Sequence, residues 1–188
     1  ASCEGAILII DATQGVESQT LSNMYLALEH DLEILPVINK IDLPAADIEA
    51  AKHQIDHDLG LDSDAAVAVS AKTGENIDAL FEAIITTFPP PKGSKDNPLQ
   101  ALIFDCHYDP YRGVVVHVRV FEGMIKPGMT IRFMNTGGEY KVEETGTFVL
   151  DLVKQDSLQA GEVGYIIAGI KTVSDVGVGD TITDAAAP

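Results

Sequence analysis

The sequence predicts two domains of different fold class, an α/β domain with a partial parallel sheet followed by an all-β barrel. Up to residue 88, short apolar runs alternate with segments of helical periodicity, which favours a parallel sheet covered by helices. A proline-rich stretch then interrupts the pattern, and after it the apolar period changes to two. We therefore place the domains at residues 1–88 and 99–188, joined by a linker at 89–98.

Three strands and three helices are expected in the first domain. The strands are predicted at residues 6–11, 32–38 and 65–69. Apolar residues at helical spacing follow each strand. They are Leu21, Met24, Tyr25 and Leu28, then Ile48, Ala51, Ile55 and Leu59, then Ile77, Leu80, Phe81, Ile84 and Phe88. Gly60 is expected to end the second helix, and Asn76 is expected to cap the third.

The second domain is predicted from strict alternation and from its turns. Valines at 114, 116, 118 and 120 alternate with Val115, His117, Arg119 and Phe121. Turn clusters at 109–113 and 135–138 separate such runs. The tight connection at 123–128 is expected to direct one strand across the domain. Several short strands with little helical pattern indicate a small closed or sandwiched β domain.

Composition limits the classes of partner. The net charge is −17. Residues 1–90 hold 3 basic and 16 acidic side chains, whereas residues 91–188 hold 9 basic and 13 acidic. A phosphate backbone should be repelled by the first part, so RNA contact is better assigned to the second. No apolar run approaches the roughly 20 residues of a membrane span. Cys3 and Cys106 are expected to be ordinary thiols, because their spacing suits neither a disulfide framework nor a metal site.

Polar residues 39–42, with the sequence Asn-Lys-Ile-Asp, follow the second predicted strand. Ligand contacts in open α/β sheets lie at such strand ends. The Asp42 carboxylate can accept from both N1–H and the exocyclic amine of guanine, in a strong bidentate pair. Asn39 is expected to join neighbouring loops and approach the base oxygen. Lys40 is expected to lay its stem along the base face while its ammonium reaches water. The alternative is a strand-end turn in which Asp42 only caps a helix.

A second strand-end segment strengthens the prediction of a base site. The run 65–69 ends in Ser70, Ala71 and Lys72, about one βαβ unit further along the chain. Ser70 can orient the Asp42 carboxylate, the Ala71 N–H can reach the guanine oxygen O6, and the Lys72 stem can cover the other base face. We predict these three residues, with Asn39, Lys40 and Asp42, to bind GTP or GDP.

These paired motifs resemble the translational GTPase family. Residues 39–42 and 70–72 are similar to its guanine-binding motifs. The strings at 3–6, 11–20, 37–44, 89–93, 113–116 and 161–171 are similar to the LepA branch (elongation factor 4). The resemblance covers essentially the whole chain. It implies the second half of a P-loop GTPase-type sheet followed by the domain II β-barrel of translation factors. It also implies a cytoplasmic protein, at most peripheral on the membrane, whose barrel faces small-subunit RNA of the ribosome. A tRNA is a further partner that the resemblance allows, and DNA is not expected.

Phosphate chemistry is not expected within this chain. The sequence holds no G-x-x-x-x-G-K-[ST] motif, so the phosphate loop and the switches of such a GTPase would lie upstream. Mg²⁺ is accordingly expected only in a full-length protein, and no catalytic residue or metal ligand is predicted here. His53 and His57 have the i, i+4 spacing of metal ligands but lack a third partner.

A binding module is the alternative function. In that case the β domain docks on RNA or protein, and the α/β domain is a scaffold without catalysis. Candidate RNA contacts, equally compatible with plain exposed charges, are Arg112, Arg119, Arg132, Lys141 and Lys171. Tyr108 and Tyr111 could stack on a base or close a turn.

Overall fold

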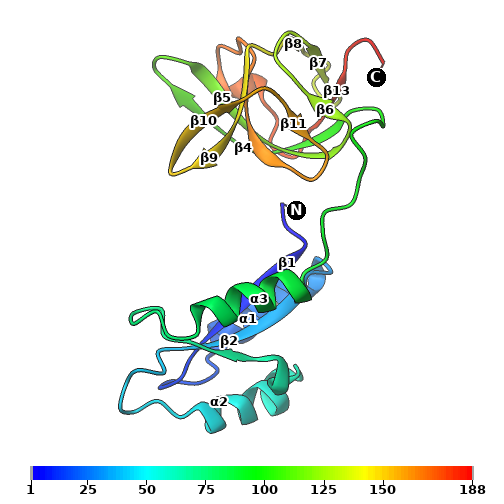
Figure 1. Cartoon of the computed structure of the whole chain (residues 1–188). Helices are drawn as coiled ribbons and strands as arrows, with labels where there is room; N and C mark the ends of the chain where they lie inside the picture. Colours follow the sequence, from blue (N-terminus) through cyan, green and yellow to red (C-terminus); the bar gives the residue numbers. More distant parts are fainter. Residues whose placement is uncertain (1, 188) are drawn as a thin grey trace. The chain divides into compact units, whose positions relative to one another are not determined.

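A computed structural model describes residues 2–187 of the chain (Figure 1). The chain divides between Pro90 and Pro91 into two compact units, an α/β unit and an all-β unit. The predicted fold class is confirmed, because the first unit holds a parallel sheet with helices and the second holds antiparallel strands.

The α/β unit is built on a three-stranded parallel sheet. Its strands are β1 (Gly5–Asp11), β2 (Glu33–Asn39) and β3 (Val67–Ala68), in the order β1-β2-β3. The register pairs Asp11 with Asn39 at the carboxyl ends of β1 and β2. Because parallel strands end at the same edge of a sheet, the loops that follow them share one side of the unit.

Helices cover both faces of this sheet. They are α1 (Ser18–Glu29), α2 (Ile48–Gln54) and α3 (Ile77–Thr87). Met24 of α1 and Ala51 of α2 pack with strand residues such as Ile10 and Ile38. On the opposite face, Leu35, Val37 and Val69 pack against Leu80 and Ile84 of α3. The alternation of side chains along β2 therefore supplies two small cores, one on each face.

One predicted detail of this unit is wrong, and two others differ in local geometry. The third strand is shorter than 65–69, because Ser63–Ala65 form a 3-10 turn held by the carboxylate of Asp56. The second helix runs without a break from α2 into a π-helical turn, Ile55–Leu59, and the predicted stripe residues Ala51, Ile55 and Leu59 are buried. Asn76 stands at the N-cap position of α3 as predicted, but its side chain donates to the carbonyl of Ala68 at 2.9 Å and makes no capping hydrogen bond. Gly60 ends the π turn in the left-handed conformation, as predicted.

The apolar stripes of helices α1 and α3 are only partly buried. Tyr25 is 63% exposed and Phe81 is 59% exposed, and Leu28 is exposed as well. These three side chains share the helical spacing of the predicted apolar stripes, but the rest of the unit does not cover them. The reason is that α1 and α3 each contact a narrow sheet, so that only part of each apolar stripe meets strand residues.

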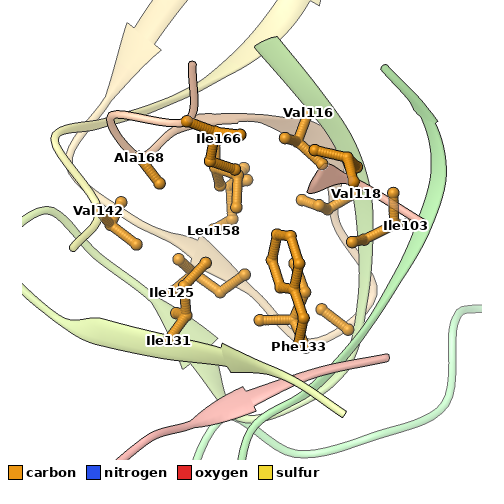
Figure 2. Packing of buried hydrophobic residues seen from close by; sticks show 14 of the residues in the cluster. Ile103, Val116, Val118, Ile125, Ile131, Phe133, Val142, Leu158, Ile166 and Ala168 are labelled. Atoms are coloured by element: carbon orange, nitrogen blue, oxygen red, sulfur yellow. The ribbon is translucent and has the colours of Figure 1, made fainter. Parts of the chain in front are cut away.

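The β unit curls around one apolar core. Strands of its main sheet follow the order β10-β9-β12-β5-β4-β13-β7-β8, and β6 pairs with β11. Their bounds are β4 Gln100–Asp109, β5 Gly113–Glu122, β6 Met124–Ile125, β7 Thr130–Phe133, β8 Glu139–Lys141, β9 Glu144–Val149, β10 Asp151–Gln155, β11 Leu158–Gln159, β12 Val163–Ile167 and β13 Thr181–Asp184. Figure 2 shows side chains from several of these strands pointing toward a common centre, among them Phe133, Ile166 and Val118.

Strand β5 is buried on both of its faces for most of its length. The predicted set at 114, 116, 118 and 120 lies in the main core. Val115, on the opposite face, packs with Tyr165 and Ile167 in a second small cluster. Arg119 is only 5% exposed, and its guanidinium lies 4.7 Å from the centroid of the Phe121 ring. Its assignment as an RNA contact is therefore wrong.

The stretch after Pro91 is attached to the end of β5. The Glu122 carboxylate accepts hydrogen bonds from the Ser94 N–H at 2.7 Å and from Asn97 Nδ2 at 2.9 Å. These two donors lower the pKa of Glu122, because they stabilise its ionised form. Residues 94 and 97 therefore belong structurally to the β unit.

Candidate nucleotide-binding site

The two polar loops predicted to form a base site lie side by side. Val37 and Ile38 of β2 pair with Val67 and Ala68 of β3. The two strands therefore reach the sheet edge together, and residues 39–42 and 70–72 leave it as neighbours. The loops are also joined at the backbone, where the Ile41 N–H donates to the carbonyl of Val69 at 3.4 Å.

Ser70 links the second loop to Asp42. Its Oγ donates to Asp42 Oδ1 at 2.7 Å and accepts from the Thr73 N–H at 3.1 Å. The Ser70 side chain is fully buried, which protects this contact from water. Asp42 does not cap the helix that follows, since Asp47 is the N-cap of α2. The alternative reading of Asp42 as a helix cap is therefore wrong.

Asn39 makes a second link between the loops. Its Oδ1 accepts from the Lys40 N–H at 2.8 Å and from the Ala71 N–H at 3.0 Å. The side chain thus joins two loops, as expected for this position. The Ala71 N–H differs from the expectation, because it is engaged by Asn39 here and is not free to meet a base oxygen.

Lys40 forms an ion pair that the sequence analysis did not predict. Its Nζ lies 2.6 Å from Asp11 Oδ2, so that the ammonium is paired with a carboxylate although the side chain remains 54% exposed. The pair lowers the pKa of Asp11 to about 2, with help from hydrogen bonds donated by Thr13, and raises the pKa of Lys40. Sequence reasoning missed this partner, because the parallel register that sets Asp11 beside Asn39 is visible only in the folded sheet.

These side chains surround a pocket of about 260 Å³. Its lining residues are Asn39, Lys40, Asp42, Leu43, Ala71 and Lys72. Five of the six predicted site residues therefore line one hollow, and the sixth, Ser70, is buried and bonded to Asp42. Leu43 was not predicted. A small hollow with a carboxylate, an amide and two lysine stems offers flat apolar contact together with a few directed acceptors, as small-molecule sites do.

The remaining candidate residues do not form a second site of this kind. Arg112 pairs with Glu144 at 3.2 Å, Arg132 is half-buried, and Lys141 and Lys171 are exposed. Residues 2–187 contain no group of three or more His, Cys, Asp or Glu side chains placed to hold a metal ion. Within the same residues, no helix is long and apolar enough to span a bilayer.

Family models match both units. The model of the elongation factor Tu GTP binding domain matches residues 1–90, and the model of elongation factor Tu domain 2 matches residues 113–183. Together they include every predicted site residue and most of the β unit.

Whole-chain relatives are proteins named elongation factor 4. The one from Treponema denticola (strain ATCC 35405) is 98% identical over all 188 residues, and the one from Treponema pallidum (strain Nichols) is 67% identical over the same span. The relative from Syntrophus aciditrophicus (strain SB) is 60% identical over 183 residues, which are 97% of this chain. The chain spans 31% of the length of each of these three proteins.

A solved structure resembles the fold. It is the apo form of translation elongation factor SelB from Methanococcus maripaludis, with a TM-score of 0.78 and 22% sequence identity. The match covers 97% of this chain and 40% of that chain. At this identity the likeness shows the fold alone, whereas the family models and the close relatives carry the assignment. On these grounds the chain belongs to the translational GTPase family.

Proposed function

We propose that this chain is the guanine-recognising half of a nucleotide-binding domain, followed by the second domain, of a ribosome-associated translation factor that binds and hydrolyses GTP. The single observation that supports this most is the 2.7 Å hydrogen bond between Ser70 Oγ and Asp42 Oδ1, which joins two strand-end loops beside one pocket. Family membership supports the class of activity, and the geometry supports the choice of base.

Asp42 is the proposed guanine reader. A carboxylate accepts from both donors on the N1–C2 edge of guanine, whereas adenine has no donor at N1. Ser70 would hold one carboxylate oxygen in place, and the stems of Lys40 and Lys72 would cover the faces of the base. Asn39 would hold the two loops together and present its amide to the base edge.

Phosphate binding and hydrolysis are assigned to other parts of the full-length protein. The chain has no phosphate-loop motif, and its described residues offer no cluster of carboxylates for Mg²⁺. No magnesium site is therefore proposed among these residues, and no chemical step is assigned to them. Their proposed contribution is selectivity for GTP and GDP over other nucleotides.

The β unit is proposed to contact the ribosome through small-subunit RNA, in the cytoplasm. Exposed Lys141 and Lys171 are suitable contacts for phosphate, and the near-neutral balance of residues 91–188 opposes RNA less than the acidic α/β unit does. A tRNA contact at the same unit remains a further proposal. The alternative, a binding module without GTPase function, has no observation that favours it over this one.

Asp42→Asn tests the base assignment in a full-length protein that carries this sequence. The amide has a donor that suits the carbonyl of xanthine at C2, where guanine has an amine. We expect the variant to lose GTP preference and gain affinity for xanthosine triphosphate. Because sites built on specific hydrogen bonds discriminate by about 10⁴-fold, the change should be large in competition binding.

The matched control is Asp47→Asn. This residue caps α2 through the Ala50 N–H and does not line the pocket, and Asn is an equally good cap. We expect the control to keep the guanine preference of the parent. Unchanged guanine selectivity in Asp42→Asn would remove the proposed reader.

A further inference from the structure

We infer that Asp11 is a positioning residue of the proposed base pocket, holding Lys40 in place before a nucleotide binds. The inference rests on the proposed function, because it concerns the same pocket. It adds a residue from β1, which is not among the pocket-lining residues and belongs to neither of the two loops that the base-binding prediction used.

The carboxylate of Asp11 is itself held by its own turn. One oxygen, Oδ1, accepts from the Thr13 N–H at 2.8 Å and from Thr13 Oγ1 at 2.7 Å. The other oxygen, Oδ2, faces Lys40 Nζ at 2.6 Å. Both oxygens are therefore used, so that the group meeting the lysine has a defined position.

Lys40 is directed toward that carboxylate by its backbone. Its φ of 68° places it in the left-handed region, which non-glycine residues rarely adopt. Its N–H is bound by Asn39 Oδ1, and the Asn39 carbonyl accepts from the Ala12 N–H at 2.9 Å. Both partners of the ion pair are thus tied to one sheet edge, and the lysine stem between them lines the pocket.

This arrangement lowers the cost of binding a flat base. A free lysine side chain has many rotamers, and ordering it against a ligand reduces affinity. With the ammonium held by Asp11, the stem is already in place. Because the Lys40 side chain is half exposed, solvent screens the pair and its effect on affinity should be modest, roughly two- to tenfold.

The test is a double-mutant cycle in the full-length protein, with GDP affinity measured by titration near pH 7. Asp11→Asn keeps an oxygen for Thr13 but removes the charge that holds the ammonium. We expect it to weaken GDP binding roughly two- to tenfold, with the loss shrinking at high salt. Lys40→Met keeps an apolar stem without the ammonium, so adding Asp11→Asn to it should change GDP affinity little.

Two results would overturn the inference. One is GDP affinity unchanged in Asp11→Asn. The other is an equal loss in the Lys40→Met background, which would mean that Asp11 acts only through its own turn with Thr13.

Base selectivity separates this inference from the proposed function. Asp11→Asn should leave the ratio of guanine to xanthine nucleotide affinities unchanged, since Asp42 reads the base edge, and a changed ratio would contradict the positioning role. The proposed function fails instead if Asp42→Asn leaves that ratio unchanged, whatever Asp11→Asn does.

Discussion

The Ser70 hydroxyl carries two hydrogen bonds from a fully buried position. It donates to Asp42 and accepts from the Thr73 N–H, so one small group orders both the carboxylate and the loop behind it. Buried polar groups lose more free energy from a missing partner than they gain from a single ordinary hydrogen bond. The residue should therefore matter for stability as well as for nucleotide binding.

Ser70→Ala is expected to lower the free energy of unfolding of the α/β unit by about 1–3 kcal/mol, because it leaves the Thr73 N–H and an Asp42 oxygen without this partner. Guanine nucleotide affinity should fall as well. Urea unfolding and GDP titration measure the two effects. The control is Ser22→Ala, whose Oγ bonds the Ser18 carbonyl on an exposed helix, with an expected change within about 0.5 kcal/mol. Equal stability of both variants would contradict the role given to Ser70.

Close strand packing in the β unit depends on two glycines. In the register of β12 with β9, Tyr165 is the partner of Gly146. A Cβ at Gly164 would lie 2.3 Å from the Gly146 carbonyl oxygen and 2.7 Å from Leu158 Cδ2. The first contact is with backbone, which cannot move aside as a side chain can. The two strands therefore need glycine here for space, and not for an unusual backbone angle.

Gly164→Ala should destabilise the β unit by about 1–3 kcal/mol, because the added methyl group forces β12 away from β9. Thermal or urea unfolding of the chain measures this change. Gly177→Ala is the matched control, since a Cβ there would meet its nearest atom, Asp180 Cβ, at an ordinary 3.6 Å. If Gly164→Ala were as stable as this control, the close approach of β12 and β9 would not require glycine at position 164.

Charge is distributed unevenly over the whole molecule. The balance is −13 for residues 1–90 and −4 for residues 91–188. An acidic surface repels nucleic acid and favours solubility, whereas exposed lysines on a near-neutral unit can meet phosphates. If the chain binds RNA, its salt dependence should therefore come from the second unit.

We expect the logarithm of the association constant of the chain for small-subunit ribosomal RNA to fall linearly with the logarithm of the salt concentration. Lys141→Ala should reduce the magnitude of this slope by roughly 1, which corresponds to the loss of one phosphate contact. The control is Lys52→Ala on α2, which should leave the slope unchanged. Filter binding across a salt series measures all three proteins. A flat response in the parent chain would contradict phosphate contact by the β unit.

The local sequence pattern was enough to predict most helices and strands. It also predicted that the loops at residues 39–42 and 70–72 lie close together. Apolar periods distinguish helix from strand, and Gly60 ends its helix in the left-handed conformation, which glycine adopts more easily than other residues do. Residues after neighbouring parallel strands must leave the same sheet edge, so residues 39–42 and 70–72 could be brought together without coordinates. The roles of individual side chains in base binding remain predictions.

Tertiary structure decided what each side chain meets. The sequence places Asp11 and Lys40 29 positions apart, and only the strand register brings them into contact. Alternation along β5 predicted Arg119 on the outer face, yet packing around it leaves it buried. Phe81 sits in an apolar stripe, yet the sheet is too narrow to cover it. Periodicity is a property of one segment, whereas burial and pairing depend on which other segments lie beside it, and that is settled only when the chain folds.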